Sequence, residues 1–248
     1  MKVDTKIIFI IFILYFTYLL LKSYLKVKEI RKKFLDDYKN KPSWVPKKWE
    51  SKIKSKFTKG DLKAFITLVI YYIHLPKFMK GPFNNIKFYH SWKEVELILA
   101  KTIPKKEFDC VVGITTGGAI ISNYIAKLLN IPNYEIKVTT YSASKKQVHT
   151  HAISNYFECK KNKSFRNKCG NSKVLNIPKI KKKSRILLVD DSINSGATMS
   201  SAYNALHKNG SEDITVYSLV SVSNLNNQNI AFDNNEWIIA LPWGGFDC

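Results

Sequence analysis

The chain begins with a long apolar run. Residues 7–21 are all apolar except Thr17. As a helix the run covers about 22 Å at ~1.5 Å per residue, short of a hydrocarbon core of ~30 Å. Lys22 can snorkel, and further apolar positions up to Val27 lengthen the apolar face. The pattern predicts a transmembrane helix within residues 1–27.

Basic residues on the two sides of this run predict its orientation. Residues 22–26 contain no small-residue cleavage site, which favours an uncleaved anchor over a signal peptide. The positive-inside rule places the more basic flank, and with it the rest of the chain, in the cytoplasm. We therefore expect a single-pass membrane protein. The basic residues compared are Lys22, Lys26, Lys28, Arg31, Lys32 and Lys33 after the run and Lys2 and Lys6 before it.

Residues 28–86 have no strand–helix alternation. The first part is basic and contains Trp44, Trp49 and two prolines, so it could bind acidic lipid headgroups or form a solvated linker. Both readings stay open. The apolar segment 64–75 is too short to cross a bilayer and predicts a core or interfacial helix. We assign this region as a basic juxtamembrane linker with a helical segment.

From residue 88 the pattern alternates between strands and helices. Ser91 and Glu94 form a capping-box sequence before a helix that carries Val95 and Leu99. Residues 108–114 then predict a buried strand. A short glycine-containing loop and a second helix follow. The apolar face expected for that helix comprises Ile120, Ile121, Tyr124, Ile125, Leu128 and Leu129.

A second strand–loop–helix unit lies further along. Residues 185–189 are an apolar run typical of a strand buried on both faces, and Asp190 and Asp191 follow it. The next helix has an apolar face, and Gly210 is placed to end it. Other strands are predicted at 134–141, 214–222 and 236–244, whereas 142–184 shows no element. The face residues are Met199, Ala202 and Leu206.

The composition points to an anionic partner. The 248 residues carry a net charge of +21, which suits nucleic acid, acidic lipid or a polyphosphate substrate. Much of the charge lies in residues 22–59 and 160–183. The four cysteines have no paired spacing, and Cys110 falls in an apolar strand, which indicates reduced thiols.

The second unit has the chemistry of a sugar-phosphate site. Backbone N–H groups and the dipole at a helix N-terminus favour a phosphate. Ser195 and Thr198 add hydroxyl donors, and Gly196 lets a ligand approach the backbone. Asp190 and Asp191 suit sugar hydroxyls or Mg²⁺ beside the phosphate. The alternative is an ordinary strand–helix turn whose aspartates cap the helix.

This stretch resembles the ribose-phosphate signature of type I phosphoribosyltransferases. The resemblance extends from about residue 88 to 248, and the part from Trp92 to Gly118 is most similar to xanthine-guanine phosphoribosyltransferases. It implies an α/β fold with an open, mainly parallel sheet flanked by helices. The implied activity is the Mg²⁺-dependent transfer of a phosphoribosyl group from phosphoribosyl pyrophosphate (PRPP) to a nucleobase, expected to be a purine.

The resemblance also assigns roles to residues. It implies that Asp190 and Asp191 bind the ribose hydroxyls or Mg²⁺, with Asn194 as the third catalytic position. The phosphate loop would be Ser192, Ile193, Asn194, Ser195, Gly196, Ala197 and Thr198. The pyrophosphate loop would be Thr115, Thr116, Gly117 and Gly118. The base would contact Trp237, Ile238 and Trp243, and the alternative for the tryptophans is a place in the core.

Two positions depart from the family pattern. Thr116 stands where Arg or Lys is usual, so a charge-assisted contact to pyrophosphate is missing. Asn194 stands where 6-oxopurine enzymes place an aspartate, and an amide is a far poorer base. These departures favour an alternative function, a catalytically inactive domain that binds nucleotide or RNA.

The predicted organisation has three parts. Residues 1–27 form the anchor, 28–86 the juxtamembrane region and 87–248 the phosphoribosyltransferase-like domain. Within that domain, residues 142–184 form a long basic loop, either a lid over pyrophosphate or a disordered insertion. The expected partners are PRPP, a nucleobase and the membrane. Binding of acidic lipid or nucleic acid through the basic segments, and a homodimer, are left open.

Overall fold

The computed structural model describes residues 5–59, 65–66, 68–69, 85–87, 89–141, 171–193, 196–221, 228–231, 236–238 and 241–243. Its main sheet has the strand order β4-β3-β2-β5-β6-β7, and every neighbouring pair is parallel except β3 and β4. This confirms the predicted open, mainly parallel α/β fold. The strands are β2 (Cys110–Ile114), β3 (Asn133–Tyr141), β4 (Asn171–Asn176), β5 (Ile186–Ile193), β6 (Ile214–Ser221) and β7 (Gln228–Ile230).

Helices cover both faces of the sheet because β2 and residues 186–189 of β5 are apolar and buried at every position. Alternate side chains of β2 and β5 point to opposite faces. Val111, Leu187 and Val189 join the core cluster that contains α4 (Trp92–Thr102) and α5 (Gly117–Leu129). Their neighbours, such as Val112 and Leu188, join the cluster that contains α8 (Ala197–Lys208). The core therefore has two layers with the sheet between them.

The helix ends follow local sequence signals. Ser91 and Glu94 form the predicted capping box at the start of α4. After α8, Gly210 has φ +97°, the left-handed conformation expected of a residue that follows a helix C-terminus. Met199, Ala202 and Leu206 are buried as predicted. The predicted face of α5 is wrong at Leu128, which is exposed.

Two parts of the sheet prediction were wrong. β4 lies within the segment 142–184 that showed no element, and it pairs antiparallel with β3. Residues 142–170 of that segment lie outside the described residues. The C-terminal strand β8 (Glu236–Ile238) does not extend the main sheet; it pairs in parallel with β1 (Asn85–Lys87) in a separate two-stranded sheet.

The N-terminal region is more helical than the sequence indicated. Helix α1 (Thr5–Lys39) continues past the predicted anchor boundary, and α2 (Lys47–Lys59) follows. Val27, Ile30 and Phe34 of α1 are buried in the same core cluster as α4 and α5. The first part of residues 28–86 is therefore packed on the domain rather than forming a solvated linker.

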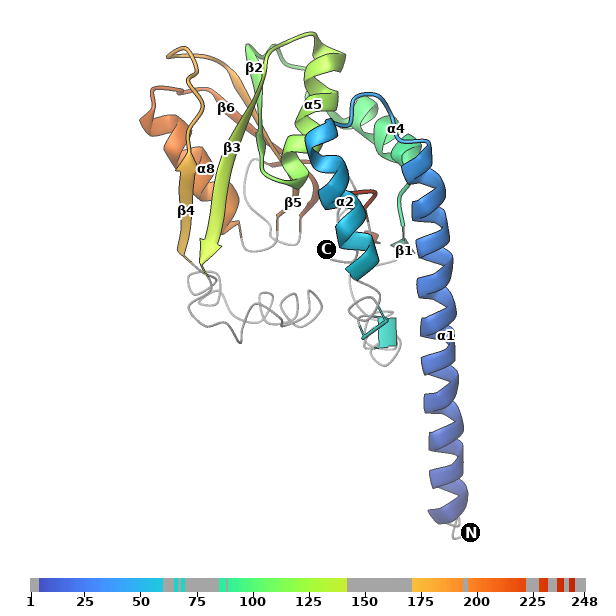
Figure 1. Cartoon of the computed structure of the whole chain (residues 1–248). Helices are drawn as coiled ribbons and strands as arrows, with labels where there is room; N and C mark the ends of the chain where they lie inside the picture. The colour runs from blue at the N-terminus through green and yellow to red at the C-terminus, as the bar shows by residue number, and fades with distance from the viewer. Residues whose placement is uncertain are drawn as a thin grey trace.

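Helix α1 has two different halves. From Phe9 to Leu25 most of its large apolar side chains are exposed, whereas its second half is packed. By length and composition, the stretch Phe9–Lys39 could cross a membrane. Figure 1 shows that α1 runs against the direction of β3, so that the exposed half extends past the edge where the parallel strands end. We call this the carboxyl edge of the sheet.

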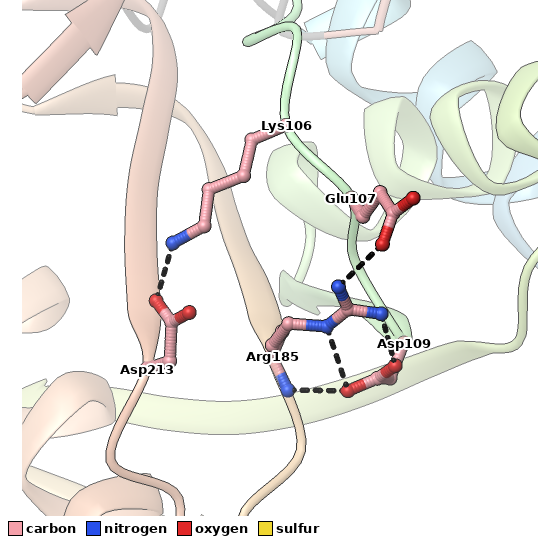
Figure 2. Close-up of polar contacts among 5 residues, drawn as sticks. All are labelled: Lys106, Glu107, Asp109, Arg185 and Asp213. Atoms are coloured by element: carbon pink, nitrogen blue, oxygen red, sulfur yellow. Dashed lines mark hydrogen bonds and ion pairs between the residues drawn. The ribbon is translucent and has the colours of Figure 1, made fainter.

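The opposite, amino edge is held by ion pairs. Arg185 precedes β5 and forms ion pairs with Asp109 at 2.9 Å and with Glu107 at 2.7 Å (Figure 2). Lys106 reaches Asp213, which precedes β6, at 2.6 Å. The Arg185 guanidinium and backbone N–H, both bonded to the Asp109 carboxylate, lower the pKa of that carboxyl to about 2. These pairs tie together the starts of β2, β5 and β6.

Candidate active site

The predicted acidic pair lies at the carboxyl edge, near the end of β5. Asp190 is in register with Ser218 of β6, and Asp191 follows it. The edge is also where α5 begins, directly after β2, with Thr116 as its N-cap residue. The structure therefore brings together the acidic pair and the predicted pyrophosphate loop, which are about 70 residues apart in sequence and sit on neighbouring strands.

Asp190 is buried at this edge. Its Oδ1 accepts a hydrogen bond from the backbone N–H of Asp191 at 2.9 Å. Burial raises the pKa of Asp190 well above its ordinary value, the charge of Asp191 raises it further, and backbone donors from Asp191 and Gly118 counteract part of the rise. Asp190 is therefore harder to ionise than a surface carboxyl. Asp191 is only half-buried, so it is the more accessible ligand of the two.

Asp191 is held from outside its own strand. Its Oδ2 accepts a hydrogen bond from the indole Nε1 of Trp243 at 2.9 Å. Its carboxylate also lies directly over Gly117, where any Cβ would overlap it. Asp191 therefore has a fixed position next to the first turn of α5, where the helix dipole favours negative charge.

The glycines of the predicted pyrophosphate loop have a packing role that the sequence did not reveal. Gly117 leaves room for the Asp191 carboxylate, and Gly118 leaves room for the backbone of β5 at Val189. Both glycines are buried and open α5. Because α5 approaches β5 closely, the acidic pair lies beside the predicted pyrophosphate loop. Thr115 and Thr116 form the turn between β2 and α5.

The predicted phosphate loop is shorter than expected. Ser192 and Ile193 belong to β5, which extends two residues beyond the acidic pair, and Ile193 is buried. Ala197 and Thr198 form the first turn of α8. Gly196, with φ +78°, is the N-cap of that helix, which agrees with the need for a glycine there. Asn194 and Ser195 lie outside the described residues.

The predicted base-contacting residues fall in two places. Trp237 and Ile238 are in β8, opposite Ile86 and Lys87 of β1. Trp243 is 1% exposed and packs in the core, which corrects its assignment to a base-stacking surface and agrees with the alternative of a core tryptophan. Trp243 still belongs to the site, since its indole N–H reaches Asp191.

The donor set limits what the site could hold. Within the part of the chain that the structure describes, no group of three or more His, Cys, Asp or Glu side chains could hold a metal ion. Mg²⁺ is commonly held by one or two carboxylates together with the phosphates of a substrate. Two adjacent carboxylates therefore fit a magnesium ion that arrives with a polyphosphate, with Asp191 as the more accessible ligand.

Sequence reasoning missed the partner of Asp191. The two residues of this contact are 52 positions apart, and Trp243 follows the main sheet in a short segment, Leu241 to Trp243, that is buried. A hydrogen bond over that separation leaves no periodic or local signal. The family resemblance did single out Trp243, but as a residue that contacts the base.

Comparison with known proteins bears on this arrangement. Residues 88–242 match the family model described as phosphoribosyl transferase domain. No curated protein sequence matches the chain.

Similar solved structures are distant. A purine phosphoribosyltransferase from Pyrococcus horikoshii Ot3 is 21% identical, with a TM-score of 0.47 over 62% of this chain and 92% of that chain. A hypothetical protein from Neisseria gonorrhoeae with bound ppGpp is 18% identical, with a TM-score of 0.46 over 66% and 91%. A Helicobacter pylori xanthine-guanine-hypoxanthine phosphoribosyltransferase is 16% identical, with a TM-score of 0.39 over 61% and 84%.

Proposed function

The chain belongs to the phosphoribosyl transferase domain family, and on this premise we propose that it is a membrane-anchored enzyme that transfers a phosphoribosyl group from PRPP to a nucleobase. The acceptor we propose is a purine, in nucleotide salvage. The observation that carries the proposal is the acidic pair at the end of β5, which lies against the first turn of α5 at the carboxyl edge. Ligands of open α/β sheets bind outside this edge.

The residues of the site would divide the reaction between them. The bond from ribose C1 to the pyrophosphate oxygen breaks, a bond from C1 to a base nitrogen forms, and the base loses a proton. Asp191, with Asp190 behind it, would hold the ribose hydroxyls or the Mg²⁺ that accompanies PRPP. Backbone N–H groups at the start of α5 would face the leaving pyrophosphate, and those at the start of α8 the 5′-phosphate. The protein would act mainly by positioning charge.

A second function has support from two residues. Thr116 supplies no cation to the leaving group, and Asn194 is a poor base. Together with the net charge of +21, they favour a domain that binds nucleotide or RNA without turnover. Binding of acidic lipid or nucleic acid by the basic segments, and a homodimer, also stay predictions.

Membrane anchoring is proposed from the first half of α1. Its large apolar side chains are exposed nearly all round the helix between Phe9 and Leu25, a pattern that suits contact with lipid. The basic residues that follow would keep the domain in the cytoplasm. Extraction of membranes with alkaline carbonate should leave the chain in the pellet. Recovery in the supernatant would exclude a spanning anchor.

A panel assay on the full chain tests the activity. The chain in nanodiscs would be incubated with PRPP, Mg²⁺ and, in turn, adenine, guanine, hypoxanthine, xanthine and uracil, and released pyrophosphate would be measured. We expect pyrophosphate release that depends on the presence of a purine. Arg185→Ala serves as a control variant that should retain this release, because Arg185 lies at the amino edge, away from the site. Binding of PRPP without pyrophosphate release in the presence of any of these bases would favour the second function. Absence of PRPP binding would rule out the transferase activity, and nucleotide or RNA binding would then be measured directly.

A further inference from the structure

Trp243 touches the acidic pair but contributes nothing to the surface of the site. Its side chain is 1% exposed, and its only described hydrogen bond runs from Nε1 to Asp191 Oδ2 at 2.9 Å. The indole is a donor only, so this contact has a fixed direction. A carboxylate oxygen that accepts such a bond on one side, and lies over Gly117 on the other, has little freedom to move.

Trp243 is itself held by a column of aromatic rings. Its ring lies 5.5 Å from that of Trp92, the first residue of α4. Trp92 lies 5.3 Å from Trp44 in an edge-on arrangement, which is favourable for aromatic pairs. Trp44 stands in the turn between α1 and α2. The column therefore runs from the acidic pair to the segment that follows the predicted anchor.

The far end of the column is also fixed. The indole Nε1 of Trp44 donates to Glu96 of α4 at 2.5 Å, and the Asn123 side chain of α5 donates to the Trp44 carbonyl. Trp44 further packs against Tyr124, with ring centroids 5.1 Å apart. The turn after α1 is thus bonded to both helices on that face of the sheet.

We propose that Trp243 is a positioning residue for the acidic pair: its indole N–H orients the Asp191 carboxylate toward the ligand, whereas the aromatic column only holds the Trp243 ring in place. The inference rests on the proposed function, because it concerns the carboxylate that we expect to bind PRPP with Mg²⁺. Trp243 would not contact the substrate. It would act by keeping Asp191 in one orientation before the ligand arrives, which lowers the ordering cost of binding.

A double-mutant cycle on the full chain in nanodiscs tests this role. The variants are Trp243→Phe, Asp191→Asn and the two combined, and the measurements are the Kd of PRPP with Mg²⁺, KM and kcat. Trp243→Phe should weaken PRPP binding about tenfold, chiefly through KM. Since the indole acts through Asp191, the combined variant should bind no more weakly than Asp191→Asn alone.

Trp92→Phe provides the matched control. Trp92 is an equally buried indole in the same column, and its Nε1 has no hydrogen-bond partner among the described residues. It should lower the melting temperature about as much as Trp243→Phe but change the PRPP KM less than about twofold. Losses that multiply in the combined variant, or equal KM effects of the two phenylalanine variants, would mean that Trp243 has only a structural role.

The remaining outcomes are also decisive. If the wild-type chain does not bind PRPP, the proposed function fails and this inference with it; if it binds and Trp243→Phe binds equally well, the inference alone fails. If Trp243→Phe does not fold, the NMR resonances of the tryptophan indole N–H groups in the wild-type chain are measured instead. The Trp243 resonance should shift both in Asp191→Asn and on addition of PRPP with Mg²⁺, while that of Trp92 stays in place. An unshifted Trp243 resonance would overturn the inference.

Discussion

The two edges of the main sheet use carboxylates in opposite ways. At the amino edge, Asp109 is exposed and bonded to Arg185, so its charge is compensated. At the carboxyl edge, Asp190 and Asp191 are adjacent, and none of the ion pairs among the described residues includes either of them. Among the described residues their donors are neutral, namely backbone N–H groups and the Trp243 indole.

This contrast separates a structural use of charge from a functional one. A carboxylate paired with arginine has a lowered pKa and gives a small contribution to stability. A buried carboxylate next to a second one has a raised pKa and costs stability while no cation is near. The chain keeps such a pair at the edge where ligands of this fold bind, which is the pattern expected when a bound cation or substrate supplies the compensation.

The largest expected effect comes from removing charge at the carboxyl edge. Asp190→Asn combined with Asp191→Asn keeps the shape of both side chains but removes their anionic oxygens. Hydrogen bonds to charged groups are worth roughly 1.5–3 kcal/mol each, so affinity for PRPP with Mg²⁺ should fall at least about tenfold. Isothermal titration of the full chain measures this.

The amino edge supplies the control for that experiment. Glu107→Gln with Asp109→Asn also removes two carboxylates, but PRPP affinity should stay within about twofold because they lie at the other edge. Equal losses of affinity from the two double variants would contradict the comparison. The alternative in which the aspartates cap the helix after β5 does not hold, because Gly196 is the N-cap of α8 and, in the described part of the chain, no side chain caps that helix.

A smaller effect is expected from glycine substitutions at the two edges. Gly117→Ala places a Cβ on the Asp191 carboxylate, which must then move, so stability should fall by about 1–3 kcal/mol and PRPP affinity should fall as well. Gly210→Ala strains a left-handed residue far from the pair and should cost about 1–2 kcal/mol with unchanged affinity. Urea unfolding and titration on both variants test this; an unaltered affinity in Gly117→Ala would show that Asp191 is not fixed there.

The smallest effect is the pH dependence of stability, which should have opposite sign at the two edges. The pKa of Asp190 is raised in the folded protein. Its contribution to the free energy of unfolding is therefore fully present below about pH 4 and is lost as the pH rises through the pKa that Asp190 has in the folded state. The pKa of Asp109 is lowered to about 2. Its contribution to the free energy of unfolding is therefore present above about pH 4 and is lost as the pH falls toward 2.

Thermal melts across that pH range separate the two carboxyls. In Asp190→Asn the melting temperature should fall less steeply as the pH rises above about 4. In Asp109→Asn it should fall less steeply as the pH decreases below about 4. The curves of the two variants should therefore depart from the wild-type curve at opposite ends. If both variants differed from the wild type in the same pH range, the carboxyls at the two edges would not have pKa values shifted in opposite directions.

Much of the fold was predictable because its signals are local. The apolar runs of β2 and β5, the capping box at Ser91 and the glycine after α8 each act within one element, and the structure confirms them. The family signature around Asp190 likewise occupies one strand, one turn and one helix start. Each of these features is determined by neighbours in sequence.

The parts that escaped prediction depend on distant residues. β4 is a polar edge strand that exists through its pairing with β3, and β8 is assigned to a separate sheet by its pairing with β1. The indole of Trp243 and the carboxylate of Asp191 meet only in the folded chain. Helix α1 continued beyond residue 27 because apolar positions there pack on the domain, although the segment reads as basic.

The direction of α1 affects how substrates reach the site. Its exposed half extends past the carboxyl edge (Figure 1), so a chain anchored by that half would turn this edge toward the lipid surface. Substrates would then reach it sideways, through a thin layer of water. An anionic leaflet carries a negative surface potential that depletes polyanions such as PRPP and enriches Mg²⁺ within a Debye length of about 8 Å. The lipid composition of the membrane would thereby become a regulator of the local substrate concentration, and nanodiscs with and without anionic lipid would reveal it as a change in KM.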